Sequence, residues 1–338
     1  MTNLPGLDLT RLGEWFTANV GETARPLTAE LISGGKSNLT YGLTDGSERW
    51  IIRRPPLGDV LATAHDMGRE YRVIHALRDT KVPVPQTFGM STDDTIIGAP
   101  FYIMSRVDGI PYRTAEELVR IGEDRTRAIS ERLVDTLVDL HAVDPASVGL
   151  AEFGRPEGFA ARQVRRWRTQ LESAYHRDLA GADELYQRLV AQAPTRADAA
   201  IAHGDYRLDN LLVDAETDQV NAVLDWEMAT LGDPLTDLAL MALYQRLDAL
   251  EAMGASDVQA APGYLPEPEM INRYATASGR DLDGFGFYVA LAAYKLAAIL
   301  EGIHLRHVNG RTVGDGFENV GNGIEPLLEL GLTAIREG

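Results

Sequence analysis

The segment from His203 to Asn210, HGDYRLDN, gathers side chains whose types and spacing could do chemistry. Asp205 carries a carboxylate that could accept a proton from a substrate hydroxyl. Asn210 offers an amide oxygen five residues later, and a second carboxylate, Asp225, ends an apolar stretch further along the chain. A proton acceptor with two further oxygen donors favours chemistry on a phosphoryl group, which needs both a base and charge neutralisation.

A hairpin would bring the two oxygen donors together. If residues 211–213 and 220–224 pair as antiparallel strands, Asn210 and Asp225 lie side by side at the open end of the hairpin. Mg²⁺ prefers such hard oxygen ligands and fills its remaining positions with waters and substrate phosphates. Asp205 would lie beside the metal, which neutralises charge on the phosphate. The spacing therefore predicts magnesium-dependent phosphoryl transfer.

The elements that must position these residues begin with a small antiparallel sheet. Hydrophobic alternation and turn residues predict strands at 30–32, 39–44, 49–54, 95–97 and 101–105. Apolar residues at helical spacing predict a helix over 63–79, after the third strand. Beyond Gly109 the same spacing predicts mostly helices, at 115–121, 125–141, 159–192, 235–247, 267–278, 285–304 and 324–336. The chain therefore changes from a small β part to a large helical part.

The HGD triplet, followed after four residues by Asn and later by a hydrophobic strand ending in Asp, resembles the aminoglycoside phosphotransferase and choline-kinase-like family of the protein-kinase-like fold. The resemblance implies an α+β bilobal fold, with a small antiparallel β N-lobe containing one helix and a large, mostly helical C-lobe. It places a nucleotide-binding lobe at residues 1–107, with a hinge at about 105–109. The catalytic and acceptor-binding lobe then covers residues 108–338.

The resemblance also implies roles for individual residues. Asp205 becomes the catalytic base or the group that orients the hydroxyl, and Asn210 and Asp225 become the magnesium ligands. Arg207, two residues after Asp205, becomes a cation that reaches the transferred phosphate. The implied cofactors are Mg²⁺ and ATP, with GTP as an alternative.

A nucleotide site is implied in the N-terminal half. Kinases carry a strand lysine there, but the three lysines of this chain lie elsewhere. Arg53 fits the position best, and Arg54 is the alternative because strand side chains alternate between faces. Glu70 matches the helix glutamate that pairs with this cation; the alternative is an exposed surface pair of Arg69 and Glu70.

Loop and hinge groups complete the implied nucleotide site. Small residues in the turn between the first two strands would let backbone N–H groups approach the phosphates. The small residues are Gly34, Gly35 and Ser37, and Lys36 could be an auxiliary contact with the phosphates. An ordinary hairpin turn is the alternative interpretation. Backbone groups of Ser105 and Val107 would bond the adenine edge at the hinge.

Basic residues bear on the acceptor. Arg162, Arg165 and Arg166 begin the helix predicted at 159–192, in the region that shapes the acceptor pocket of these kinases. They suggest an anionic acceptor, although an exposed arginine-rich helix face is the alternative. Lys295 lies on an otherwise apolar helix, where it could anchor a carboxylate, but we expect its amine to reach the surface.

The strings GGKSNLTY, RQVRRW and LDWEMATLGDPLTDLA look most like the kinase-like domains attached to some acyl-CoA dehydrogenases, which phosphorylate hydroxyl groups on acid-like or acyl metabolites. The sequence thus predicts an ATP- and Mg²⁺-dependent small-molecule O-phosphotransferase whose acceptor is a hydroxyl of such a metabolite. One alternative is an aminoglycoside O-phosphotransferase that confers antibiotic resistance. The other is a nucleotide-binding module without useful turnover, for which the missing strand lysine is the argument.

Composition excludes several other classes. The 338 residues contain no cysteine, which excludes disulfides, thiolate zinc sites, iron–sulfur clusters and a cysteine nucleophile. The net charge of −18 argues against a nucleic-acid partner. The first residues lack the pattern of a signal peptide, and we expect no membrane-spanning segment and a cytoplasmic location. The composition leaves the oligomeric state open.

Overall fold

The protein is described by a computed structural model, which covers residues 4–33, 38–57, 66–195, 199–247, 256–310 and 317–337. The chain divides into two compact units. The first contains Met1–Gly109 together with Asn221–Ala229, and the second contains Ile110–Val220 together with Thr230–Gly338. The lobes expected at 1–107 and 108–338 differ from these units mainly because residues 221–229 return to the first unit.

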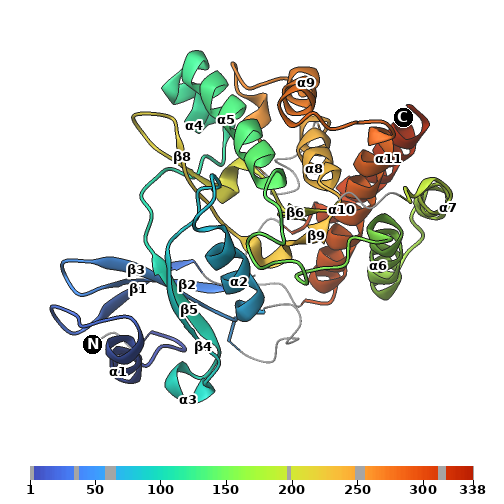
Figure 1. The fold of residues 1–338 in the computed structure, drawn as a ribbon. Coiled ribbons are helices and arrows are strands. Elements are labelled where there is room, and N and C mark those ends of the chain that lie inside the picture. The colour runs from blue at the N-terminus through green and yellow to red at the C-terminus, as the bar shows by residue number, and fades with distance from the viewer. Residues whose placement is uncertain are drawn as a thin grey trace. The chain divides into compact units, whose positions relative to one another are not determined.

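The first unit is built on a five-stranded sheet with the order β1-β2-β3-β5-β4, in which neighbouring strands run antiparallel. Figure 1 shows this sheet with its helices. The elements are α1 Leu9–Asn19, β1 Thr28–Ser33, β2 Leu39–Thr44, β3 Arg49–Arg54, α2 Met67–Leu77, β4 Thr87–Ser91, α3 Asp94–Ile97 and β5 Phe101–Ser105. The strands predicted at 39–44, 49–54 and 101–105 are confirmed with the same bounds.

Side chains alternate along the strands, so the two faces of this sheet pack against different elements. One face carries Tyr41, Ile52 and Ile103, which pack with Leu12 and Phe16 of α1 in an apolar core. The opposite face packs against α2. Because successive strand residues point to opposite faces, neighbours in β3 serve different sides of the sheet.

The strand predicted at 95–97 is wrong. These residues form α3 instead, because Asp93 caps a helical turn by accepting a hydrogen bond from the Thr95 N–H at 2.9 Å. Gly98 ends the turn in the left-handed region, with φ of +81°, where a side chain would be strained. The strand that pairs with the outer edge of β5 is β4, which sequence analysis missed.

The helix predicted at 63–79 is confirmed as α2, with narrower bounds. Asp66 begins it by accepting a hydrogen bond from the Arg69 N–H at 3.0 Å. Residues 63–65 of the prediction lie outside the described part of the chain.

The second unit is mostly helical. Its helices are α4 Ala115–Ile121, α5 Glu123–His141, α6 Phe159–Ala174, α7 Ala182–Gln192, α8 Leu235–Gln245, α9 Glu267–Ser278, α10 Phe285–Val308 and α11 Ile324–Glu337. Its short strands are β6 Ala200–Ala202, which pairs antiparallel with β9 Thr230–Gly232, and β7 Leu211–Val213. Beyond β7, a turn closed by the Asp214 N–H and the Gln219 carbonyl leads into β8 Val220–Val223, within which the chain passes to the first unit.

The single helix predicted at 159–192 is wrong, because the chain forms two helices, α6 and α7. Tyr175 leaves the first helix with extended backbone. Gly181 stands before the second helix with φ of +81°, in the left-handed region that favours glycine. The apolar spacing continues through both helices, so it does not reveal the break.

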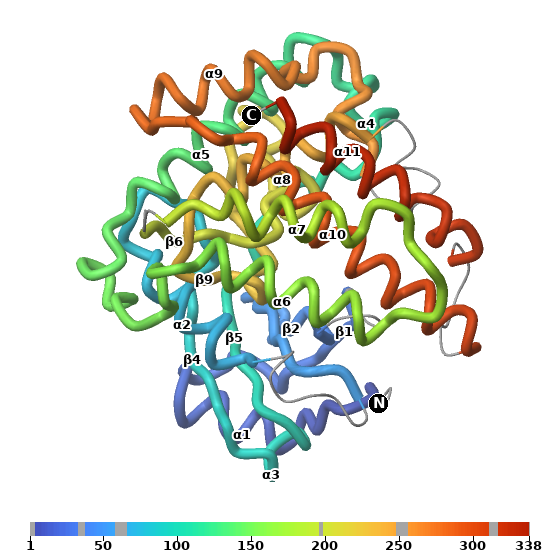
Figure 2. The backbone as a smooth tube through the Cα atoms, turned by 90° about the vertical axis from the view of Figure 1, so that its right-hand side faces the viewer, coloured from blue at the N-terminus to red at the C-terminus, as the bar shows by residue number. Residues whose placement is uncertain are grey.

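The centre of the second unit is α10, which packs against α6, α7, α8 and α11. Figure 2 shows α6, α7 and α11 alongside it. By length and composition α10 could cross a membrane, but 67% of its apolar window is buried within the protein. That burial is typical of a core helix.

Candidate active site

The first unit holds a buried ion pair between β3 and α2. Arg53 Nη1 lies 2.8 Å from Glu70 Oε1, and both side chains are almost completely buried. A second carboxylate, Asp225, approaches Arg53 Nη2 at 3.3 Å. The structure thus brings Arg53 together with the predicted Glu70, and adds Asp225 as a partner that sequence analysis missed.

Electrostatics keep this arginine charged. Burial alone would lower the pKa of Arg53, but the carboxylates of Glu70 and Asp225, together with Tyr102, outweigh burial and raise it above its ordinary value. The side chain of Tyr102 lies on the same face as Arg53, directly across the β3–β5 pair. A guanidinium held in this way offers a fixed positive charge to a phosphate group.

Arg54, the other candidate for the strand cation, lies on the opposite face. Its guanidinium donates to the Ile97 carbonyl at 2.9 Å and to the carbonyl of Gly6. Its Nε donates to the Pro55 carbonyl at 3.1 Å. These carbonyl partners make Arg54 a brace between β3, the N-terminal segment and α3.

The segment 221–229 is anchored in the first unit by several contacts. The Trp226 indole is fully buried, and the Val223 N–H donates to the Pro83 carbonyl at 2.8 Å. The Arg69 guanidinium donates to the Ala229 carbonyl at 3.1 Å. Glu70 is buried against Arg53, so the alternative of an exposed surface pair of Arg69 and Glu70 is wrong. Asp225 has φ of +65°, a conformation that costs an L-residue about 1–2 kcal/mol.

The predicted loop and hinge groups fall in two classes. Gly34, Gly35, Lys36 and Ser37 lie outside the described residues. At the hinge, β5 ends with Ser105, whose N–H donates to the Gln86 carbonyl at 2.8 Å and whose hydroxyl accepts from the Gln86 N–H at 3.0 Å. Val107 follows the strand and is partly exposed. The N–H of Ser105 is therefore already engaged within the unit.

In the second unit, Asp237 of α8 fixes the start of the HGD segment. Its carboxylate accepts hydrogen bonds from the N–H groups of His203 and Gly204, each at 2.7 Å. His141 Nε2 lies 3.2 Å from the same carboxylate, and His141 Nδ1 lies 2.7 Å from the Tyr274 hydroxyl. Burial alone would raise the pKa of Asp237, but the hydrogen bonds and the charge of His141 hold it below its ordinary value.

The same network explains His203. Its ring is buried, and its Nδ1 accepts a hydrogen bond from the Asp205 N–H at 3.2 Å. A histidine that accepts from the backbone of its own loop braces that loop. These hydrogen bonds give His203 and Asp237 structural roles in holding the loop.

Asp205 and Asn210 come together at the end of this braced segment. The Asn210 amide donates to the Asp205 carbonyl at 2.9 Å and to Asp205 Oδ2 at 3.2 Å. The donation orients the amide, because its nitrogen faces Asp205 and its oxygen is turned away. The Asp205 carboxylate itself is about one-third exposed, so it remains open to a substrate.

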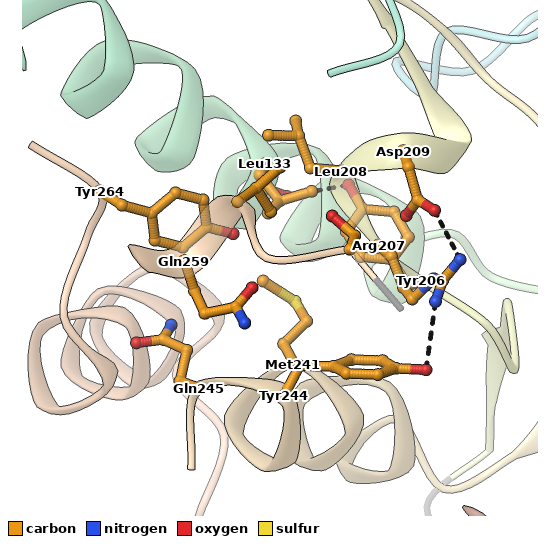
Figure 3. A pocket seen from close by; sticks show the side chains of 12 residues that line it. Leu133, Tyr206, Arg207, Leu208, Asp209, Met241, Tyr244, Gln245, Gln259 and Tyr264 are labelled. Atoms are coloured by element: carbon orange, nitrogen blue, oxygen red, sulfur yellow. Dashed lines mark hydrogen bonds and ion pairs between the residues drawn. The ribbon is translucent and has the colours of Figure 1, made fainter. Parts of the chain in front are cut away.

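Arg207 is held beside this carboxylate. Its Nε lies 3.7 Å from Asp205 Oδ1, and its Nη2 lies 2.5 Å from Asp209 Oδ2. The guanidinium also stacks over the Tyr244 ring, 5.3 Å from its centroid, and contacts the Tyr244 hydroxyl (Figure 3). Burial alone would lower the pKa of Arg207, but Tyr244 and the two carboxylates raise it above its ordinary value. Arg207 therefore stays protonated.

A small pocket opens beside Arg207. Figure 3 shows it between Tyr206, Met241 and Tyr264, with Arg207 and Asp209 at one end. Asp209 is buried enough that its pKa rises above the ordinary value. The pocket is mainly apolar, with charged groups at one end only.

The Lys295 side chain is partly exposed, but its amine is bound within the second unit. The amine of Lys295, from α10, donates to the Gly204 carbonyl at 2.5 Å. It also lies 5.7 Å from the centre of the Trp167 ring. Burial lowers the pKa of Lys295, whereas the charges of Asp205 and Asp237 oppose that shift.

The predicted magnesium ligands fit the ion by chemistry. Asn210, in the second unit, donates through its amide nitrogen to Asp205, which leaves its amide oxygen for another partner. Asp225, in the first unit, has a partly exposed carboxylate. Within the described ranges, no group of three or more His, Asp or Glu residues could hold a metal. Mg²⁺ does not require such a group, because it is commonly bound by one or two protein oxygens with waters and substrate phosphates.

Comparison with known proteins identifies the family. The model of the phosphotransferase enzyme family matches residues 28–271, which include the ion pair of the first unit and the HGD segment of the second. The chain belongs to this family. A structure from Ralstonia eutropha, described as an aminoglycoside phosphotransferase, is 31% identical to this phosphotransferase, with a TM-score of 0.86 over 98% of both chains. This confirms the expected family and the kinase-like α+β fold.

Other relatives of this phosphotransferase differ in length or in sequence. Acyl-CoA dehydrogenase family member 11 from Gallus gallus is 33% identical over 92% of this chain, and the match covers 41% of that protein. The chain thus spans about two-fifths of the length of the curated relatives it matches first. The aminoglycoside phosphotransferase APH(4)-Ia, solved with AMP-PNP and hygromycin B, is 14% identical with a TM-score of 0.60, over 97% of this chain and 99% of that one. That likeness concerns the fold alone.

Proposed function

We propose that this chain is an ATP- and Mg²⁺-dependent kinase that transfers the γ-phosphoryl group to the hydroxyl of a small molecule. The observation that carries the proposal is the position of Asp205. Its backbone is braced by His203, its side chain is bonded by Asn210, and its carboxylate remains partly exposed. A base for a hydroxyl must be positioned in this way before substrate binds.

In the proposed reaction, Asp205 orients the acceptor hydroxyl and receives its proton as the oxygen attacks the γ-phosphorus. The bond from the γ-phosphorus to the bridging oxygen breaks, and ADP leaves with that oxygen. Arg207, which stays protonated, stabilises negative charge on the transferred group. Arg53, fixed by Glu70, holds the nucleotide phosphates. Asn210 and Asp225 would each offer an oxygen ligand to Mg²⁺, which would neutralise charge on the phosphates.

We further propose a hydroxy acid or an acyl metabolite as the acceptor. The family match supports phosphotransfer without naming an acceptor. Curated relatives with acyl-CoA dehydrogenase names are about one-third identical to this chain. The aminoglycoside 3'-phosphotransferase of Streptomyces fradiae is 25% identical over 70% of it. An ammonium-rich acceptor needs acidic surroundings, whereas Lys295 and Arg207 lie next to Asp205 here.

The test is an ATP-consumption screen of the purified protein with Mg²⁺. The acceptor panel contains hydroxy acids, hydroxyacyl-CoAs, sugars, amino alcohols and aminoglycosides. Asp205→Ala serves as the blank, because losing the positioned base lowers general acid–base catalysis by about 10²–10⁴-fold. Nucleotide binding should survive in this variant, since Asp205 and Arg53 lie in different units.

Turnover that depends on Asp205 with one acceptor class would support the kinase and identify its acceptor. Turnover that is near normal in Asp205→Ala would contradict the proposed mechanism. Nucleotide binding without turnover on any acceptor would favour the alternative of a binding module.

A further inference from the structure

We propose that Arg166 and Lys295 form an anion-binding subsite next to Asp205, which holds an anionic group of the acceptor while its hydroxyl faces the base. The inference rests on the proposed kinase function and names the residues that would select the acceptor. Two helices build the subsite, α6 with Arg166 and α10 with Lys295.

Lys295 supplies the inner cation. An ammonium group has three N–H donors, and among the described residues the Gly204 carbonyl is its one hydrogen-bond partner. Gly204 directly precedes Asp205 in the chain, and the charge of Asp205 acts on the amine, so the amine lies near the base. A partly buried ammonium with unused donors gains strongly from an anionic ligand, because burial weakens the screening by water.

Arg166 supplies the outer cation. Its guanidinium stacks over the Trp167 ring, 5.1 Å from the centroid, and the Lys295 amine lies 5.7 Å from the same centroid. In the part of the chain that the structure describes, Arg166 forms no ion pair with a carboxylate. Arg166 also lowers the pKa of Lys295, after the larger effect of burial, so the two charges repel each other. An anion between them would relieve that repulsion.

The other two arginines of this helix are placed differently. Arg162 donates to the carbonyls of Glu157 and Arg155, which makes it a brace for the turn before α6. Arg165 is exposed and lines a surface hollow with Arg168 and other residues of α6 and α7. Of the three arginines that the sequence offered for an anionic acceptor, the structure selects Arg166.

The chemistry of the ligand follows from the two cations. A guanidinium can bind a carboxylate or a phosphate through two parallel hydrogen bonds, and an ammonium adds a point charge. The acceptor would therefore carry one of these anions within a few bonds of its hydroxyl. A neutral alcohol of the same shape would lack the interaction.

The experiment measures binding by isothermal titration calorimetry in the presence of AMP-PNP and Mg²⁺. The probes are 3-hydroxybutyrate and its neutral counterpart 1,3-butanediol, and glycerol 3-phosphate with glycerol as its counterpart. The variants are Arg166→Gln and Lys295→Met, with Arg165→Gln as a matched control on the same helix. Thermal unfolding checks that each variant is folded, and Arg166→Lys tests whether charge alone suffices.

We expect the wild type to bind one anionic probe at least about tenfold more tightly than its neutral counterpart. The neutral probe cannot form the charge-assisted hydrogen bond, whose loss accounts for a difference of this size. Arg166→Gln and Lys295→Met should each remove most of that preference, and Arg165→Gln should keep it. Which of the two anionic probes binds shows whether the subsite prefers a carboxylate or a phosphate.

Equal binding of anionic and neutral probes by the wild type, or no binding of either anion, would overturn the inference. So would a preference that survives in both Arg166→Gln and Lys295→Met. Failure of the proposed function would look different. In that case anions would still bind through Arg166 and Lys295, but no phosphoryl transfer dependent on Asp205 would occur.

Discussion

Removal of Glu70 tests the buried ion pair of the first unit. In Glu70→Ala, Arg53 loses its partner at 2.8 Å while its side chain remains only 10% exposed. Removing one member of a buried ion pair leaves a charge without compensation and typically costs about 3–5 kcal/mol. We therefore expect Glu70→Ala to lower the free energy of unfolding by that amount. Asp225, 3.3 Å from Arg53, limits the loss.

The corresponding change in melting temperature follows from the size of the protein. An unfolding entropy of about 2.1 cal/mol/K per residue gives about 0.7 kcal/mol/K for 338 residues, so the loss lowers Tm by about 4–7 °C. Calorimetry gives Tm, and urea titration gives the free energy. Glu70→Gln should lose less, because it keeps the shape and polarity of the side chain.

The same unit offers a matched control. Glu30 pairs with Arg106 at the same distance of 2.8 Å, but these side chains are 65% and 35% exposed. An exposed pair contributes about 0–1 kcal/mol, so Glu30→Ala should leave Tm almost unchanged. If Glu70→Ala is no more destabilising than Glu30→Ala, burial does not govern the strength of the Arg53 ion pair, and our reasoning is refuted.

Two further predictions concern Asp237 and Arg54. Asp237→Asn places an amide N–H₂ against backbone donors and should cost about 1–3 kcal/mol at pH 7. The pKa of Asp237 is lower in the folded protein than in the unfolded chain. Its ionised carboxylate therefore stabilises the fold above the ordinary pKa of about 3.9, and this stabilisation is lost as the pH falls from there through the folded pKa. The urea midpoints of wild type and variant should therefore draw together as the pH falls below about 3.9 towards the depressed folded pKa; a gap that does not change with pH would contradict this. Arg54→Met should lower Tm through the lost bond to Ile97 yet leave AMP-PNP binding intact, whereas Arg53→Met should weaken that binding; equal weakening by both would contradict the assignment.

Much of the fold could be predicted from local patterns. The strands at 39–44, 49–54 and 101–105 follow from alternation, turns and the hydrophobic run, and the structure has the same bounds. The two wrong predictions have local causes that hydrophobic patterns do not show. A capping aspartate turned residues 94–97 into a helix, and Gly181 divided a helical run whose apolar spacing hardly changes.

The candidate site was predictable where sequence spacing controls geometry. Asp205 and Asn210 meet because five residues of one loop separate them. The partners that were missed come from distant segments. Asp225 reaches Arg53 across 172 positions, and Lys295 reaches Gly204 across 91 positions from an otherwise apolar helix. Contacts of this kind depend on tertiary packing, which the spacing of apolar residues along the sequence does not predict.

The return of residues 221–229 to the first unit has a consequence for synthesis. When the ribosome has made Gly109, the sheet is complete but Arg53 still lacks Asp225, and α2 lacks the carbonyl that binds Arg69. The missing segment ends at Ala229, which is made 120 residues later. At translation rates of about 5–20 residues per second, the first unit waits roughly 6–24 s for its last part. During that interval the nascent sheet must persist with a buried face that is not yet fully covered, and this is the period in which a chaperone would have most to do.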